Sequence, residues 1–204
     1  MRRPGRSAEG ELPSATVALL LIDVINPLEF EGGEALLKEA LPAARRLAQL
    51  KTDLADHGVP VVYVNDNFGY WDLGFRELVA LFERTANRGQ PLIRLLAPSP
   101  GDYFILKPKH SGFYGTSLEL LLERVGARTL ILTGFAANIC VWFTANDAHM
   151  RGFRLIVPAD CVASEQAADT KYVLDQMQRV MHADVRPADL CCAAITRTGV
   201  QRAV

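Results

Sequence analysis

Residues 16–23 read TVALLLID, an apolar run that ends at a single carboxylate, Asp23. The run is apolar throughout rather than alternating, which is typical of a strand buried on both faces of a parallel sheet. Five further runs rich in Val, Ile, Leu or Ala are predicted as strands: Pro60–Asn65, Asp102–Lys107, Thr129–Phe135, Arg154–Pro158 and Leu190–Thr196.

The intervals between these runs mostly carry the periodicity of amphipathic helices. We predict helices over Glu34–His57, with a kink or restart at Pro42, and over Leu73–Arg84, Ser117–Val125, Ile139–Gly152 and Glu165–Met181. Alternating strands and helices specify an α/β three-layer α/β/α sandwich around a six-stranded, mainly parallel, Rossmann-like sheet.

Length and composition favour one domain over residues 15–204, preceded by a flexible tail at 1–14. The 204 residues include 22 Lys plus Arg and 23 Asp plus Glu, with no strong run of one sign. We therefore expect a small-molecule substrate, with no nucleic-acid or membrane partner. The four cysteines have no paired metal-ligand spacing, so we expect reduced thiols and a cytoplasmic protein: Cys140, Cys161, Cys191 and Cys192.

Polar residues end or follow five of the predicted strands, where ligands bind in sheets of this kind. They are Asp23, Asp66, Lys107, Cys140 and Asp160. A thiol at a helix N-terminus is stabilised as a thiolate, and a nearby lysine lowers its pKa further. A carboxylate at a strand end is suited to proton transfer. Each residue alone also has an ordinary structural interpretation: a core cysteine, a turn-capping aspartate and a solvated lysine.

Three segments together resemble the isochorismatase-like cysteine hydrolases, a superfamily that includes nicotinamidases, N-carbamoylsarcosine amidase and isochorismatase. Residues 18–26 (ALLLIDVIN) are similar to the strand that ends in the catalytic aspartate, although Ile25 stands where Gln is common. Residues 107–116 (KPKHSGFYGT) resemble the lysine motif and favour Lys107 over Lys109. Residues 134–141 (GFAANICV) resemble the nucleophile loop.

The resemblance implies that Cys140 is the nucleophile, that Asp23 accepts and returns its proton, and that Lys107 supports their charges. It also implies a cis peptide between Phe135 and Ala136, which turns the amides of Ala136 and Cys140 toward an oxyanion. Family members commonly form dimers or tetramers, so we expect a homodimer or homotetramer.

Two departures from the family bear on the function. Residues 65–71 contain no histidine, so the metal site of nicotinamidases is not expected, and we predict neither metal nor cofactor. The loop carries Ala137-Asn138 where Thr or Ser followed by Asp is frequent.

The leading hypothesis is hydrolysis of a small amide, carbamoyl or imide C–N bond through a Cys140 thioester. A vinyl-ether hydrolase of isochorismatase type and a catalytically silent binding protein on the same fold are the alternatives. The connection 66–100 has the length of a lid or subunit contact. Candidate substrate-binding residues are Asn26, Leu28, Asp66, Phe68, Trp71, Phe113 and Phe135.

Overall fold

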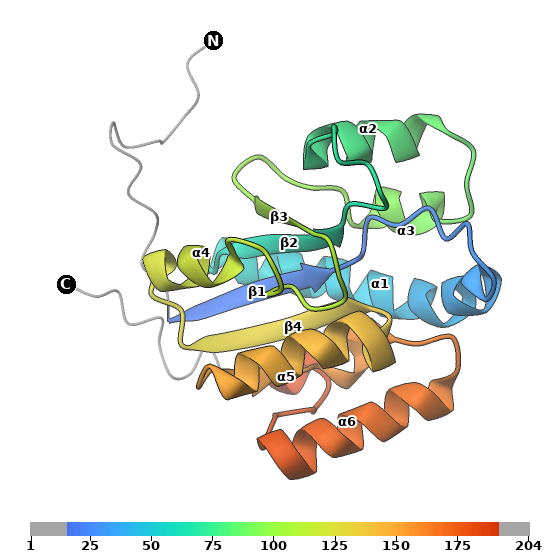
Figure 1. Ribbon diagram of the computed structural model, residues 1–204. Helices are drawn as coiled ribbons and strands as arrows, with labels where there is room; N and C mark the ends of the chain where they lie inside the picture. Colours follow the sequence, from blue (N-terminus) through green and yellow to red (C-terminus); the bar gives the residue numbers. More distant parts are fainter. Residues whose placement is uncertain (1–15, 192–204) are drawn as a thin grey trace.

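A computed structural model describes residues 16–191, and Figure 1 shows helices packed around a central sheet. The predicted tail at 1–14 lies outside these residues. The sheet has six strands in the order β3-β2-β1-β4-β5, with β6 also pairing with β4, and every pairing is parallel. The strands are β1 (Val17–Ile22), β2 (Val61–Asp66), β3 (Tyr103–Lys107), β4 (Thr129–Phe135), β5 (Arg154–Ile156) and β6 (Val162–Ala163).

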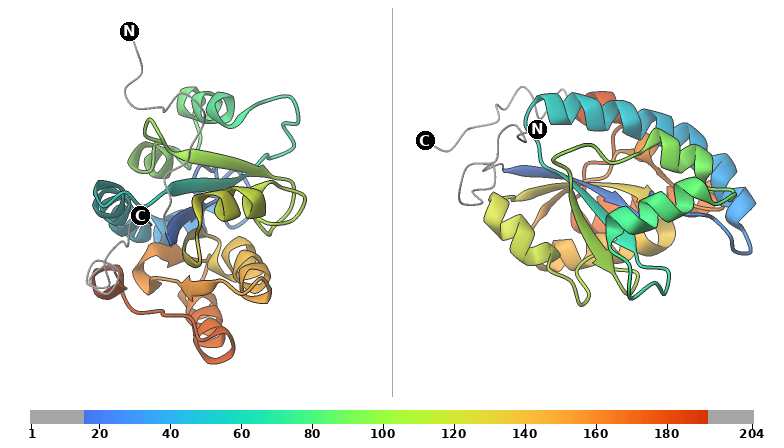
Figure 2. Two further views of the ribbon diagram at one scale, coloured as in Figure 1. Left: turned by 90° about the vertical axis from the view of Figure 1, so that its left-hand side faces the viewer. Right: turned by 90° about the horizontal axis from the view of Figure 1, so that it is seen from above.

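The α-helices lie on both faces of the sheet, as predicted, and Figure 2 shows α1 and α5 on opposite sides. They are α1 (Gly33–Asp56), α2 (Phe75–Arg84), α3 (Gln90–Leu95), α4 (Leu118–Val125), α5 (Trp142–Met150) and α6 (Ala167–Met181). A π-helical turn, η1 (Ala137–Val141), precedes α5, and a 3-10 turn, η2 (Ala159–Cys161), precedes β6. Helix α1 continues through Pro42 without a break.

Strand β1 explains why its sequence is apolar throughout. Leu19 and Leu21 belong to the core beneath α1, α2 and α3, whereas Leu20 and Ile22 belong to the core beneath α4, α5 and α6. All four side chains are inaccessible to solvent. Because neighbouring side chains of a strand point to opposite faces, a strand covered on both sides must be apolar at every position.

The prediction of a strand over Leu190–Thr196 is wrong where it can be checked. Leu190 and Cys191 lie in a helical turn, and both backbone amides donate to the carbonyl of Pro187. Residues 192–196 lie outside the described part of the chain. The sixth strand is instead β6, whose two residues are too few to give a periodic signal. Helix α3, only six residues long, also escaped prediction.

The strand order places the ends of four strands side by side. Asp66 pairs with Lys107 in the β2–β3 register, and Ile22 pairs with Gly134 in the β1–β4 register. Residues that follow β1, β2, β3 and β4 therefore meet at one edge of the sheet. Among residues 16–191, no helix combines the length and the apolar character needed to cross a membrane.

Candidate active site

Asp23 lies directly after β1 and is almost completely buried. Its backbone adopts a left-handed conformation (φ 50°), which aspartate tolerates better than most residues. One carboxylate oxygen accepts a hydrogen bond from the Asp66 amide at 2.6 Å. The other lies 2.8 Å from the ammonium of Lys107. Asp23 is therefore held from both sides in one orientation.

Lys107, the last residue of β3, is fully buried, yet its ammonium has several polar neighbours. Besides Asp23, the Nζ atom lies 3.6 Å from the Asp66 carboxylate and donates to the Lys109 carbonyl at 3.2 Å. It also lies 3.6 Å from the Sγ atom of Cys140. A buried ammonium surrounded by acceptors is fixed in place and stays charged.

Cys140 is half-buried in the π-helical turn between β4 and α5. Its thiol is hydrogen-bonded to the Asp23 carboxylate as well as to Lys107. Thr144, one turn later, donates its hydroxyl to the Cys140 carbonyl at 2.7 Å. The peptide bond between Phe135 and Ala136 is cis, which confirms that prediction.

Gly134 allows β4 to lie close enough to β1 for this geometry. It has φ 108°, and a Cβ atom there would lie 2.0 Å from the Ile22 carbonyl oxygen. Any larger residue would push the loop that carries Cys140 away from Asp23. A glycine is therefore required at the first position of the loop motif.

Burial and the neighbouring charges shift the pKa of each member of this cluster. Burial raises the pKa of Asp23, although Lys107 acts in the opposite direction. Burial and the Asp23 carboxylate raise the pKa of the Cys140 thiol, and Lys107 offsets this only in part. Burial disfavours the charged form of Lys107, but Asp23 and Cys140 outweigh that effect and raise its pKa. The expected lowering of the Cys140 pKa by Lys107 is present, but burial and Asp23 have the larger effect and leave the pKa raised. Asp23 faces the Lys107 ammonium at 2.8 Å and the Asp66 amide at 2.6 Å, so we assign the cluster as a thiol, a carboxylate and an ammonium.

Residues 17–198 match the family model described as "Isochorismatase domain", which covers most of the chain. This protein belongs to the isochorismatase family.

Three relatives of this isochorismatase-family protein match it over most of their own length. An uncharacterised isochorismatase-family protein of Bacillus subtilis, YaaI, is 39% identical over 85% of this chain and 95% of its own. The ureidoacrylate amidohydrolase RutB of Methylorubrum extorquens is 30% identical over 80% of this chain and 75% of its own. The crystal structure of N-carbamoylsarcosine amidase from Thermoplasma acidophilum superposes with a TM-score of 0.65 at 31% identity, covering 85% and 97% of the two chains.

Two other carboxylates at strand ends have different surroundings in this family member. Asp66 lies beside Lys107 and also accepts the Phe68 amide at 2.7 Å, so it caps its own loop. Asp160 is not in the cluster. It pairs with Arg46 of α1 at 3.2 Å and accepts the Ala188 amide at 2.8 Å, which ties α1 to the segment after α6.

The candidate substrate-binding residues are divided among several environments. Leu28 and Phe135 pack in the core on the α1 side of the sheet, and Phe113 packs in the core on the α5 side. The ring of Phe113 lies 4.8 Å from the Arg151 guanidinium. These three side chains contribute to packing rather than to an open surface. Phe68 is half-buried against the α1-side core, and Trp71 is 78% exposed.

The loop after Asp23 depends on Asn65, which sequence reasoning missed. Its fully buried side chain accepts the Ile25 amide at 3.0 Å and donates to the Ile25 carbonyl at 2.9 Å. Asn26 accepts the Leu28 amide at 2.9 Å and so shapes the same loop. The only available signal was a polar residue at the end of an apolar strand.

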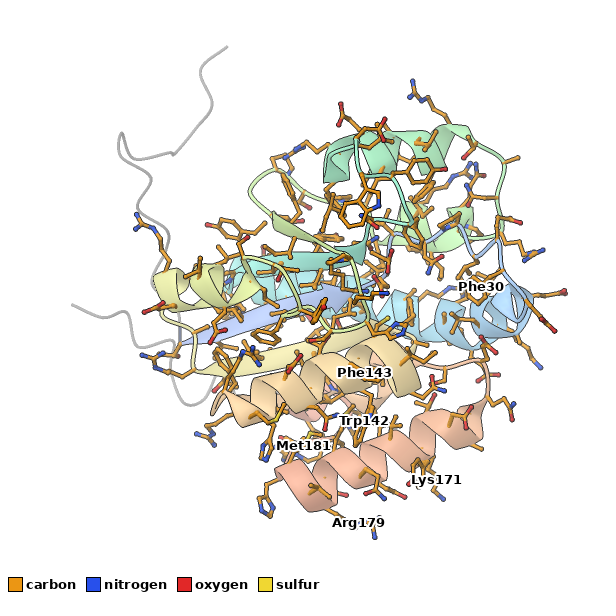
Figure 3. All side chains as sticks on the ribbon, in the orientation of Figure 1. Phe30, Trp142, Phe143, Lys171, Arg179 and Met181 are labelled. Atoms are coloured by element: carbon orange, nitrogen blue, oxygen red, sulfur yellow. The ribbon has the colours of Figure 1, made fainter. Side chains whose placement is uncertain are left out.

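A cavity of about 400 Å³ lies away from the Asp23–Lys107–Cys140 cluster. It is lined by residues of α1, α6 and the β6 region, including Glu39, Ala163 and Lys171. Figure 3 shows Lys171 on α6, whereas Phe143 lies on α5. None of the three cluster residues lines this cavity. We place the candidate active site at the strand ends because the buried charges of Asp23 and Lys107 lie beside the thiol of Cys140 there.

Proposed function

We propose that this protein hydrolyses a small amide, carbamoyl or imide C–N bond through a thioester on Cys140. The observation that carries the proposal is that one buried ammonium, Lys107, lies 2.8 Å from a carboxylate and 3.6 Å from a thiol. A base in contact with a nucleophile, and a cation in contact with both, is the arrangement that covalent catalysis requires. The amidohydrolase and amidase names of its relatives support C–N bond hydrolysis.

In the first half of the proposed reaction, Asp23 accepts the thiol proton as the Cys140 sulfur bonds to the carbonyl carbon. The carbonyl electron pair moves to oxygen, and the backbone amides of Ala136 and Cys140 are proposed to stabilise the resulting oxyanion. The C–N bond then breaks, and Asp23 returns the proton to the leaving nitrogen. Lys107 remains charged throughout, which limits the cost of moving negative charge between sulfur and Asp23.

In the second half, water attacks the thioester. Asp23 accepts a proton from the water, the C–S bond breaks, and the sulfur regains a proton from Asp23. The raised pKa of Cys140 is compatible with this cycle because the thiol needs to lose its proton only while the new bond forms. The same high pKa makes the return of the proton to sulfur favourable.

The test is mass spectrometry of the intact protein after exposure to a panel of small amides. We expect an acyl adduct on the wild-type protein and none on Cys140→Ala, which should also lose hydrolysis of every amide in the panel. If Asp23→Asn abolishes turnover of a vinyl ether while Cys140→Ala retains much of it, the isochorismatase-type reaction is correct instead. Absence of both an adduct and turnover would favour a binding protein.

The segment 66–100 is proposed to serve as a lid or subunit contact in a homodimer or homotetramer. Tyr70 and Trp71 are both exposed there, with Trp71 at 78%. Large exposed aromatic side chains are enriched in protein interfaces. Light scattering of the wild type and of Trp71→Ser would test this proposal, and a monomeric wild type would reject the assembly.

A further inference from the structure

His110 is an additional polar group beside the nucleophile, on its solvent-facing side. Its Nδ1 atom lies 4.0 Å from the Sγ atom of Cys140, and its side chain is exposed. The imidazole also packs against the ring of Phe143 on α5, with 5.4 Å between ring centroids. Asp23 and Lys107 contact the same sulfur from positions that are almost wholly buried.

The loop that carries His110 is anchored on both sides of that residue. Before it, the Lys109 carbonyl accepts a hydrogen bond from the Lys107 ammonium at 3.2 Å. After it, the Ser111 hydroxyl bonds to Asp147 on α5. The Gly112 amide donates to the Thr144 hydroxyl at 3.0 Å.

Thr144 connects this anchoring to the nucleophile, because its hydroxyl also bonds to the Cys140 carbonyl. The segments that carry the imidazole and the sulfur are therefore tied to each other. This places a hydrogen-bonding ring close to the attacking atom. Such rigid support is typical of residues that orient a substrate.

The arrangement of the four groups bonded to the reacting carbon indicates which part of a substrate would lie near His110. In the tetrahedral intermediate, the carbon carries the sulfur, the oxyanion, the leaving nitrogen and the acyl chain. The nitrogen must lie near Asp23, which protonates it, and the oxyanion near the loop amides. The acyl chain then extends toward the remaining, solvent-exposed side of the sulfur, where His110 lies.

We propose that His110 is a specificity-determining residue that donates a hydrogen bond to a carboxylate or carbonyl oxygen on the acyl chain. The proposal rests on the proposed function, since it uses the same intermediate. It predicts a substrate class: amides whose acyl chain carries a second oxygen-bearing group, in preference to amides with a purely aliphatic chain of the same shape. The half-exposed Phe143 ring would support the flat imidazole from behind.

Two variants separate hydrogen bonding from packing. His110→Phe keeps an aromatic ring against Phe143 but removes the ring nitrogens, whereas His110→Asn keeps a donor close to the Nδ1 position. His149→Phe is the matched control, because His149 is an exposed histidine near the other end of α5. The probes are succinamate and 4-methylpentanamide, which have similar shapes but differ in that a carboxylate is replaced by an isopropyl group.

Two measurements are made on each protein: kcat/KM for both amides, and protection of Cys140 from iodoacetamide by succinamate. For His110→Phe we expect kcat/KM for succinamate to fall about tenfold, with about a twofold change at most for 4-methylpentanamide. The succinamate concentration that gives half-protection should rise by a similar factor. His110→Asn should retain most of both properties, and His149→Phe should match the wild type.

Equal losses for the two amides in His110→Phe would overturn the proposal, and so would a failure of succinamate to protect the wild-type thiol. Failure of the proposed function gives a different result: neither amide is hydrolysed and no acyl adduct forms, yet protection by succinamate still depends on His110. The protection measurement reports binding and needs no turnover.

Discussion

The Asp23 carboxylate and the Lys107 ammonium form a buried ion pair 2.8 Å long, with side-chain exposures of 5% and 0%. Both side chains are almost wholly shielded from bulk solvent, so each charge depends on the other. Breaking such a pair by removing one partner is far more costly than the net stability that the pair provides.

Lys107→Met should therefore lower the free energy of unfolding by about 3–5 kcal/mol, because it leaves Asp23 buried without its counter-ion. Adding Asp23→Asn to this variant should recover part of the loss, since the remaining side chain is then neutral. Urea unfolding of the two single variants and the double variant gives the coupling energy between the two positions. Additive losses would show that the two charges do not depend on each other.

Asp23→Asn should change the rate of Cys140 alkylation and the rate of amide hydrolysis in opposite directions. The Asp23 carboxylate raises the pKa of the thiol, so its removal leaves Lys107 as the nearest charge and lowers that pKa. Alkylation by iodoacetamide at neutral pH should become faster, while amide hydrolysis should fall by about 100-fold or more because the proton acceptor is lost. Slower alkylation in this variant would contradict the assigned charges.

In the wild type, alkylation of Cys140 should keep rising with pH beyond the ordinary thiol pKa of about 8.5. The reactive species is the thiolate, and burial followed by the Asp23 carboxylate holds the pKa of Cys140 above its usual value. The rate should therefore climb about tenfold per pH unit through the range where an unperturbed thiol levels off. Peptide mapping across a pH series measures this, with a cysteine-containing peptide as the reference. A plateau below pH 8 would show that the thiol is acidic instead.

Gly134→Ala should destabilise the protein by about 3 kcal/mol or more, since the new methyl group would meet the Ile22 carbonyl oxygen at 2.0 Å. Gly58→Ala is the control: Gly58 also has a positive φ (75°), but nothing lies within 4 Å of a Cβ atom there. It should cost only about 1 kcal/mol. Thermal unfolding of both variants distinguishes steric contact from backbone conformation, and equal losses would argue against the close contact.

Much of the fold was predictable because the apolar runs are long. The runs of β1, β2 and β4 fill strands that are buried along almost their whole length, so their composition shows their environment directly. The elements that escaped prediction, β6 and α3, have two and six residues and rely on pairing or packing that local sequence does not reveal. Leu190 and Cys191 were predicted to begin a strand but lie in a helical turn, because an apolar composition suits both structures.

The positions of Asp23, Lys107 and Cys140 could be predicted because each follows or ends a strand. Their electrostatics could not. A position after a strand suggests a helix N-terminus and hence an acidic thiol, but the pKa depends on burial and on the distance to Asp23, which only the three-dimensional arrangement gives. The roles of Asn65 and Thr144 escaped for a similar reason, since their partners are backbone groups of distant loops or of the preceding turn.

The three members of the cluster come from the ends of β1, β3 and β4; β4 pairs directly with β1, and β3 joins them through β2. Pairing of β1 with β4 joins parts of the chain that are far apart in sequence, and such contacts form late in folding. Without this pairing, Cys140 would not lie beside the Asp23 carboxylate. The proposed catalysis would thus require the β1–β4 pairing, which brings the Asp23 and Cys140 ends of the two strands together.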